Sequence, residues 1–418
     1  MLNPIIDIAL LLFAAKVGGI LFSKIKQPSI AGELIAGVVI GPSILGLAAE
    51  SALVTSVSYL GLLFLILLVS LSIDWKTLEG NTEKLTWIEI VRVFGVFCLT
   101  FLAAELFAWD IYVTLVFGFV VALSSTAIVS RSLADMKQLG SAEGQTLMGL
   151  EVVDEVLAIV AAALLANVMG GATIDPVNII TLILVVIGLF AGMSRVGFKL
   201  VNRFTSYIQK YGVQEALLGF TLLLAFLLGG LTESLGLASI LGVFIAGMIL
   251  SRSAQLPIIT TKVKDIGESF FIPIFFASVG LTLGMQTLLG SLPLLATIIG
   301  VIVAIKVVSC VATLKLFRYP MDQALKVSSG IVTLSEMTIV IAALAKGKLS
   351  PELYASLIAA FIIVNTAAPI LMNLTFKKAS SVCQMQLSVS SGKKGFKIPR
   401  KWPWTRKKGK QGYSWNGS

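Results

Sequence analysis

An otherwise apolar segment, GLEVVDEVLAIV, contains three acidic side chains. On a helix, Glu151, Asp154 and Glu155 lie within about one turn of one another. Carboxylate oxygens bind protons, and they also suit a desolvated Na⁺, which prefers oxygen ligands. Neighbouring carboxylates at low dielectric repel each other, so a proton or a cation close to them is favoured. The spacing therefore predicts a site at which protons and a monovalent cation compete.

Further polar groups interrupt other apolar segments of the chain. They are Ser124, Ser125, Thr126, Lys306, Ser335 and Glu336. At a rise of about 1.5 Å per residue, Asp154, Glu155 and the polar groups of the other segments lie roughly 18–24 Å from the segment ends. Four segments thus place polar groups at one depth, which residues scattered at random would not do.

Each of these residues also has a structural interpretation. A charge at the centre of a bilayer costs at least about 2.5–3.5 kcal/mol, so Lys306 is expected to have a partner or a function. Glu151 could bond a neighbouring helix, and the hydroxyl side chains could bond carbonyls of their own helix. Glu33 is expected near a helix terminus, and Glu89 and Arg92 are expected to extend toward the membrane surface.

The composition sets the class of protein. The 418 residues are 57% hydrophobic and 13% charged, whereas soluble domains average about 45–50% apolar and about 25% charged. A single water-soluble core is therefore excluded. Since histidine is absent, proton chemistry falls to carboxylates, lysines and water. The three cysteines lack CxxC spacing, which predicts no disulfide framework or zinc site. We expect no enzyme activity and no cofactor besides transported ions.

Apolar runs predict an all-α polytopic membrane protein with about thirteen spanning helices. The predicted ranges are 4–23, 28–48, 53–73, 86–108, 111–136, 142–170, 174–204, 213–234, 236–251, 266–288, 290–317, 322–347 and 352–376. Basic residues gather in the loops after odd-numbered helices, whereas the loops after even-numbered ones hold only Lys346 and Lys348. The positive-inside rule then predicts an outside N-terminus and a cytoplasmic C-terminus.

The two halves of the chain resemble each other at a constant offset. Residues 29–37 (SIAGELIAG) and 239–247 (SILGVFIAG) agree at six of nine positions, 210 residues apart, and the same offset relates Glu155 to Asn365. This offset pairs helices that are seven apart, so the two copies have opposite orientations. We expect two inverted-topology repeats, helices 1–6 and 8–13, with a binding site near the midplane.

The chain divides into two predicted parts, a transmembrane domain (1–378) and a basic cytoplasmic tail (379–418). Basic residues in the tail alternate with aromatic ones between 393 and 410. This pattern fits a disordered segment or docking on anionic lipid. Nucleic-acid binding is not expected of a tail tethered to a membrane.

Several motifs, in order, resemble the monovalent cation:proton antiporters of the CPA2 branch. They are QPSIAGELIAGVVIGPSILGL, ALSSTAIVSRSL, VVDEVLAIV, SILGVFIAGMILS and FIPIFFASVGLTL. The likeness extends over residues 4–376. It implies a homodimer with a dimerisation part, a mobile core part with crossed discontinuous helices 5 and 12, and elevator-like transport.

The resemblance also implies roles for individual residues. The family's Asp-Asp pair falls on Asp154 and Glu155, so Asp154 would pair with Lys306 and Glu155 would hold Na⁺ with Ser125 and Thr126 nearby. Glutamate stands where the family normally has its second aspartate. In an alternative register, the Gln-Asp pattern of the K⁺ efflux systems falls on Val153 and Asp154. The division of roles between the two carboxylates therefore stays open.

The combined expectation is an antiporter that exchanges Na⁺ (or Li⁺) for H⁺ across the cytoplasmic membrane of a prokaryote. K⁺/H⁺ exchange on the same scaffold is the near alternative, and a gated cation channel is a more distant one. For Na⁺/H⁺ and K⁺/H⁺ exchange alike, the secondary polar candidates around the site are Glu151, Ser335, Glu336 and Asn365.

Overall fold

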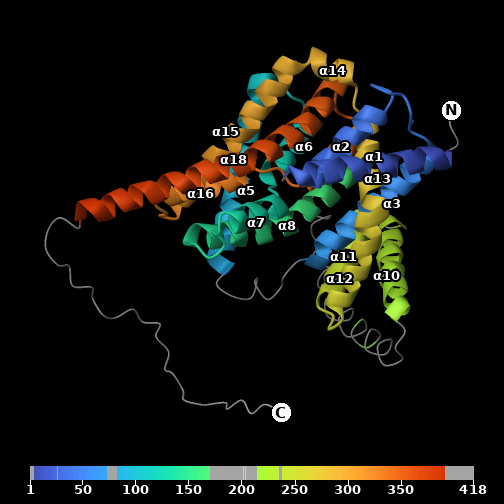
Figure 1. Ribbon diagram of the computed structural model, residues 1–418, viewed down its shortest axis with the longest axis horizontal. Helices are drawn as coiled ribbons and strands as arrows, with labels where there is room; N and C mark the ends of the chain where they lie inside the picture. The colour runs from blue at the N-terminus through green and yellow to red at the C-terminus, as the bar shows by residue number, and fades with distance from the viewer. Residues whose placement is uncertain are drawn as a thin grey trace, which may run out of the picture. The chain divides into compact units, whose positions relative to one another are not determined.

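The computed structural model is helical throughout the parts of the chain that it describes (Figure 1). These parts are residues 4–25, 27–72, 82–169, 201, 203, 214–234 and 238–390. The predicted helix at 174–204 lies almost entirely outside them, as does most of the predicted tail. Residues up to Phe376 form one compact unit, to which the following description applies.

The first half of the chain supplies α1 (Pro4–Lys24), α2 (Ser29–Ile40), α3 (Ala52–Ser72), α5 (Thr82–Phe107), α6 (Ile111–Ala122), α7 (Thr126–Asp135) and α8 (Ala142–Met169). The second half supplies α10 (Gln214–Ser234), α11 (Ser239–Ser251), α12 (Leu256–Ile266), the π-helical turn η1 (Gly267–Phe271), α13 (Ile272–Leu281), α14 (Met285–Gly290), α15 (Leu292–Leu316), α16 (Met321–Ile331), α17 (Met337–Ala345) and α18 (Pro351–Ser390).

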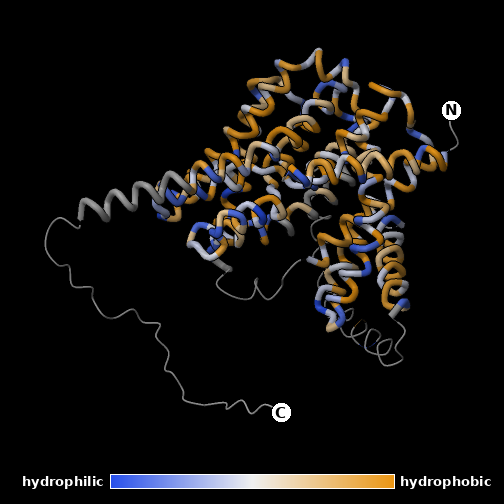
Figure 2. Tube along the Cα trace, in the orientation of Figure 1, coloured by the Kyte–Doolittle hydropathy of each residue, from blue (hydrophilic) through white to orange (hydrophobic). Residues whose placement is uncertain are grey.

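Within the described residues, seven helical segments are long and apolar enough to cross a bilayer. Hydrophobic residues predominate along α10 and α15 (Figure 2), and several of them face outward. Leu223 on α10 is 62% exposed and Leu316 on α15 is 69% exposed, and Phe94 on α5 is 70% exposed. An outer surface this apolar suits contact with lipid and not with water.

The predicted and observed helices can be compared one by one. The predicted helix at 28–48 ends at Ile40, because extended Gly41 and then Pro42 follow it. The segments predicted at 111–136 and 322–347, helices 5 and 12, are each interrupted, as the family resemblance implied. The predicted loop before residue 266 is largely the helix α12, which apolar runs could not reveal because only Ile259 and Val263 of it are buried.

Candidate functional site

Two helices of the core are interrupted, and both interruptions leave backbone groups without helical partners. The first break separates α6 from α7 at residues 123–125, where Leu123 and Ser125 have extended backbones. The second break separates α16 from α17 at residues 332–336. Helix ends leave N–H and C=O groups unpaired, so a break inside a core needs partners from other elements.

The two breaks contact each other. The backbone N–H of Ser125 donates to Thr333 Oγ1 over 3.0 Å, and the Ser125 hydroxyl donates to Glu336 Oε1 over 2.9 Å. Residues more than 200 positions apart are thereby joined through hydrogen bonds. The predicted polar positions of the two halves therefore meet in one place.

Side chains from α8 and α18 hold the backbone of the breaks. Asp154 on α8 accepts from the backbone N–H of Ser124 over 2.8 Å. Asn365 on α18 accepts from Leu334 N over 2.8 Å and donates to Leu334 O over 2.9 Å. Both side chains are buried. One acidic and one neutral side chain thus fulfil the same structural need in the two halves.

The carboxylates of α8 gather around the hydroxyl groups of the first break. Ser124 Oγ lies 2.9 Å from Glu151 Oε1 and 2.5 Å from Asp154 Oδ2. Thr126 Oγ1 lies 3.2 Å from Glu151 Oε2. Glu151 is fully buried and Asp154 is 2% exposed. The predicted residue Glu155 is on α8, but its side chain lies outside the described part of the chain.

Two buried cations face the C-terminal end of α6. Arg92 on α5 forms ion pairs with Glu89 and with Asp154, the latter over 3.1 Å, and donates to the carbonyl of Ala122 over 2.7 Å. Lys306 on α15 donates to the carbonyl of Leu123 over 2.7 Å. The carbonyl end of a helix carries partial negative charge, which buried cations stabilise.

This arrangement corrects two predictions. The expected ion pair between Asp154 and Lys306 is replaced by one with Arg92, and Lys306 has no ion pair within 4.0 Å among the described residues. Glu89 and Arg92 are fully buried and do not extend to a surface. Their spacing of three residues on an apolar helix was the available signal, because it places opposite charges on one face.

A cavity of about 790 Å³ borders both breaks. Its lining includes Ser124, Thr126, Ser335 and Glu336 from the breaks. The opposite wall comes from α1, α2, α3, η1 and α13, and reaches Lys24 at the end of α1. The hydroxyl groups next to the α8 carboxylates are thus accessible to a small cation from this cavity.

Sequence comparison decides the family. The family described as "Sodium/hydrogen exchanger, transmembrane" matches residues 10–378. The chain belongs to this sodium/hydrogen exchanger family. It is a multi-pass membrane protein that transports monovalent cations and protons as an antiporter, and it is not an enzyme. The resemblance to CPA2-type antiporters is thereby confirmed.

Relatives of this sodium/hydrogen exchanger are similar over nearly their whole length. The Na(+)/H(+)-K(+) antiporter GerN of Bacillus cereus is 25% identical over 372 residues, 88% of this chain and 95% of GerN. The high-affinity Na(+)/H(+) antiporter NhaS3 of Synechocystis is 26% identical over 418 residues, 90% of either chain.

The fold also matches a solved structure. The sodium proton antiporter MjNhaP1 from Methanocaldococcus jannaschii at pH 8 matches with a TM-score of 0.69 at 16% identity, covering 90% of this exchanger and 98% of that chain. This likeness establishes an all-helical, multi-span antiporter fold for the exchanger. Its candidate site is the junction of the two breaks with α8.

Proposed function

We propose that the chain exchanges Na⁺ (or Li⁺) for H⁺ across the cytoplasmic membrane of a prokaryote, by elevator-like alternating access. The proposal is carried by one observation, the buried carboxylates of α8 at hydroxyl groups that line a cavity. Asp154, Glu155, Ser125 and Thr126 form the proposed cation and proton site.

The hydrogen bonding of Ser124 supports proton binding at this site. A serine hydroxyl has one proton, yet its oxygen lies within hydrogen-bond distance of both Glu151 and Asp154. Two full hydrogen bonds at this oxygen are favoured when one of the two carboxyl groups carries a proton, because a single hydroxyl proton would otherwise be shared between them. A cation that enters from the cavity and binds these oxygens would displace that proton, which is the coupling an antiporter needs.

The contacts of Asp154 support a division of roles between the two adjacent carboxylates. One Asp154 oxygen faces Arg92 and the other binds Ser124, so Asp154 is engaged in holding the first break. We assign Glu155 to the cation together with Thr126, and Glu151 stays a secondary candidate. Lys306 and Arg92 supply compensating positive charge at the end of α6.

Close contacts at glycines support two inverted repeats. A Cβ on Gly37 would lie 2.0 Å from Ala277 O, and one on Gly247 would lie 3.2 Å from Leu67 O. The offset of 210 residues carries Gly37 onto Gly247 and carries Ala277 back onto Leu67, so the two contacts are equivalent. Gly61, which the offset carries onto residue 271, would place a Cβ 2.3 Å from the carbonyl oxygen of that same residue. Such reciprocal contacts are those of a two-fold relationship.

The finer architecture follows from this symmetry. We propose thirteen spans, helices 1–6 and 8–13 as repeats, and crossed broken helices formed by α6/α7 and α16/α17. Residues 1–378 would form the transmembrane domain, with an outside N-terminus. Residues 379–418 would form a cytoplasmic tail, with anionic lipid as its proposed partner, and the chain would act as a homodimer.

The ion specificity is tested in everted vesicles that contain the protein and a pH-sensitive dye. After respiration acidifies the lumen, addition of Na⁺ or Li⁺ should release protons and restore fluorescence. Release by K⁺ alone would overturn the sodium assignment. Cation flux without proton movement would replace the antiporter mechanism with a gated channel.

K⁺/H⁺ exchange is the second candidate, favoured by one observation. The relative GerN, which matches over 88% of this chain, carries K⁺ in its name as well as Na⁺. The same vesicle series decides between the two cations, because each is added alone to one preparation.

A further inference from the structure

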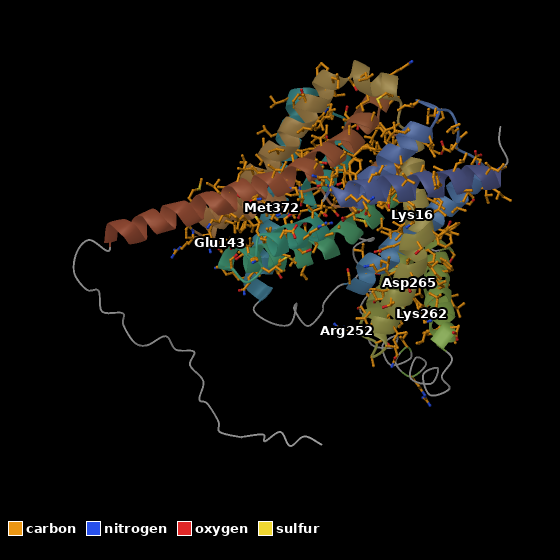
Figure 3. All side chains as sticks on the ribbon, viewed as in Figure 1. Lys16, Glu143, Arg252, Lys262, Asp265 and Met372 are labelled. Atoms are coloured by element: carbon orange, nitrogen blue, oxygen red, sulfur yellow. The ribbon has the colours of Figure 1, made fainter. Side chains whose placement is uncertain are left out.

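The wall of the cavity opposite the breaks carries a second group of charges. α1 supplies Lys16, α2 supplies Glu33 and η1 supplies Glu268, and all three residues line the cavity. Lys16 lies where α1 meets α13 and η1 (Figure 3). None of the three hydrogen-bonds a described residue of the breaks or of α8.

The π-helical turn leaves one backbone carbonyl without a helical donor. In η1, the N–H of Ile272 donates to Gly267 O, five residues earlier. The next donor in this pattern would be residue 273, which is Pro273 and has no N–H. Glu268 O is therefore free of a partner within the helix, and Lys16 Nζ donates to it over 2.5 Å.

Glu33 is a buried carboxylate to which no described residue donates a hydrogen bond. It is 8% exposed, and among the described residues it has no hydrogen bond and no cation within 4.0 Å. A Cβ on Gly19 would lie 3.2 Å from Glu33 Oε1, so the carboxylate packs on α1 one turn from Lys16. Lys16 lies within electrostatic range of it. A buried carboxylate is costly unless a cation or water solvates it.

We infer that the Glu33 carboxylate and the Glu268 carbonyl form a second monovalent-cation site, and that the Lys16 ammonium blocks the carbonyl ligand of this site when no cation is bound. The ammonium is itself a monovalent cation and already contacts one of the proposed ligands. An incoming Na⁺ or K⁺ displaces it, with cavity water completing the coordination. The inference rests on the proposed function only for the choice of ligand.

Binding of radioactive Na⁺ to the purified full-length chain tests the site. Asp154→Asn and Glu155→Gln first remove the proposed transport site. When Lys16→Met is added to this doubly substituted chain, one Na⁺ per chain should bind about tenfold more tightly than before the addition. Further addition of Glu33→Gln should abolish that binding. Lys24→Met is the matched control, because Lys24 lines the same cavity without a bond to the free carbonyl, and it should not tighten binding.

Transport kinetics of single variants provide the second readout, which does not depend on a multiply substituted chain. Lys16→Met should lower the apparent KM for the cation and Glu33→Gln should raise it. Glu268→Gln, whose exposed carboxylate pairs with Lys264, should leave KM unchanged because the carbonyl remains.

Two results would overturn the inference. One is Na⁺ binding in the Lys16→Met background that survives Glu33→Gln, and the other is an equal shift of KM in Lys16→Met and Lys24→Met. If the unsubstituted chain fails to exchange cations for protons while Glu33-dependent binding is present, the proposed function fails and the second site stands.

Discussion

The two helix breaks leave the same kind of backbone groups unpaired and satisfy them with different chemistry. In the first, Asp154 binds Ser124 N, and Arg92 and Lys306 bind the carbonyls that end α6. In the second, neutral Asn365 binds both backbone groups of Leu334. An amide cannot gain or lose a charge, so the second break is held permanently, whereas the first is held by groups that bind protons and cations.

In the proposed inverted-repeat scaffold, this difference explains why the proposed site is asymmetric. Both halves must satisfy the backbone groups that a broken helix leaves unpaired. One half does so with an amide, and the other with a carboxylate that a buried guanidinium balances. The proposed site therefore lies at the break whose structural requirement is met by an ionisable group.

The largest expected effect on stability is that of Arg92. Arg92→Ala leaves Glu89 and Asp154 buried without their cation, which should destabilise the fold by about 3–5 kcal/mol. Thermal unfolding in detergent measures this loss. Arg92→Lys keeps the charge but loses the bidentate geometry of the guanidinium. Its unfolding temperature should lie between those of the unsubstituted chain and Arg92→Ala. An unchanged unfolding temperature for Arg92→Ala would show that the first break is not held by charge.

Lys306→Ala should have a smaller effect than Arg92→Ala. It removes one charged hydrogen bond, to Leu123 O, worth about 1.5–3 kcal/mol. Because Lys306 contacts a carbonyl and not Asp154, measurable cation/proton exchange should persist. Proteoliposome exchange measured beside thermal unfolding checks both parts. Full loss of exchange with unchanged stability would instead support Lys306 as the charge partner of Asp154.

A substitution at the second break should lower the stability of the fold without removing the ionisable groups of the first break. Asn365→Ala leaves both Leu334 groups unpaired, at a cost of about 1–3 kcal/mol. Asn373→Ala, on the same helix and with no hydrogen bond among the described residues, is the control and should change little. Equal unfolding temperatures for the two variants would refute the proposed role of Asn365.

Glu336→Gln should have the smallest effect. The amide oxygen of glutamine still accepts the Ser125 hydroxyl, so the junction of the breaks is kept and the cost should be about 1 kcal/mol or less. Exchange rates in proteoliposomes should remain close to those of the unsubstituted chain. A complete loss of exchange would mean that the second break also contains an essential proton site.

Hydropathy predicted the long spans well, because a bilayer demands about 20 apolar residues whatever their neighbours are. The predicted helix at 290–317 and the observed α15 differ by two residues at most at either end. The breaks were invisible to hydropathy. Residues 120–123 (VVAL) are apolar and are predicted as helix from hydropathy. The extended form of the break at 123–125 is stabilised by contacts with α5, α8, α15 and the second break.

The candidate carboxylates of α8 were predictable because buried charge is costly and therefore stands out. Their partners were not predictable in the same way. Arg92 lies close to the predicted start of its helix, and a position along a sequence does not reveal that α6 and α8 pack over it. Its selection as the partner of Asp154 in place of Lys306 depends on tertiary packing alone.

Cation-driven proton movement in proteoliposomes tests the central claim, that α8 carboxylates exchange a proton for a cation, most directly. The account predicts robust exchange for the unsubstituted chain and none for Glu155→Gln or Asp154→Asn, each purified as a folded protein. Exchange at the unsubstituted rate in both variants would contradict it.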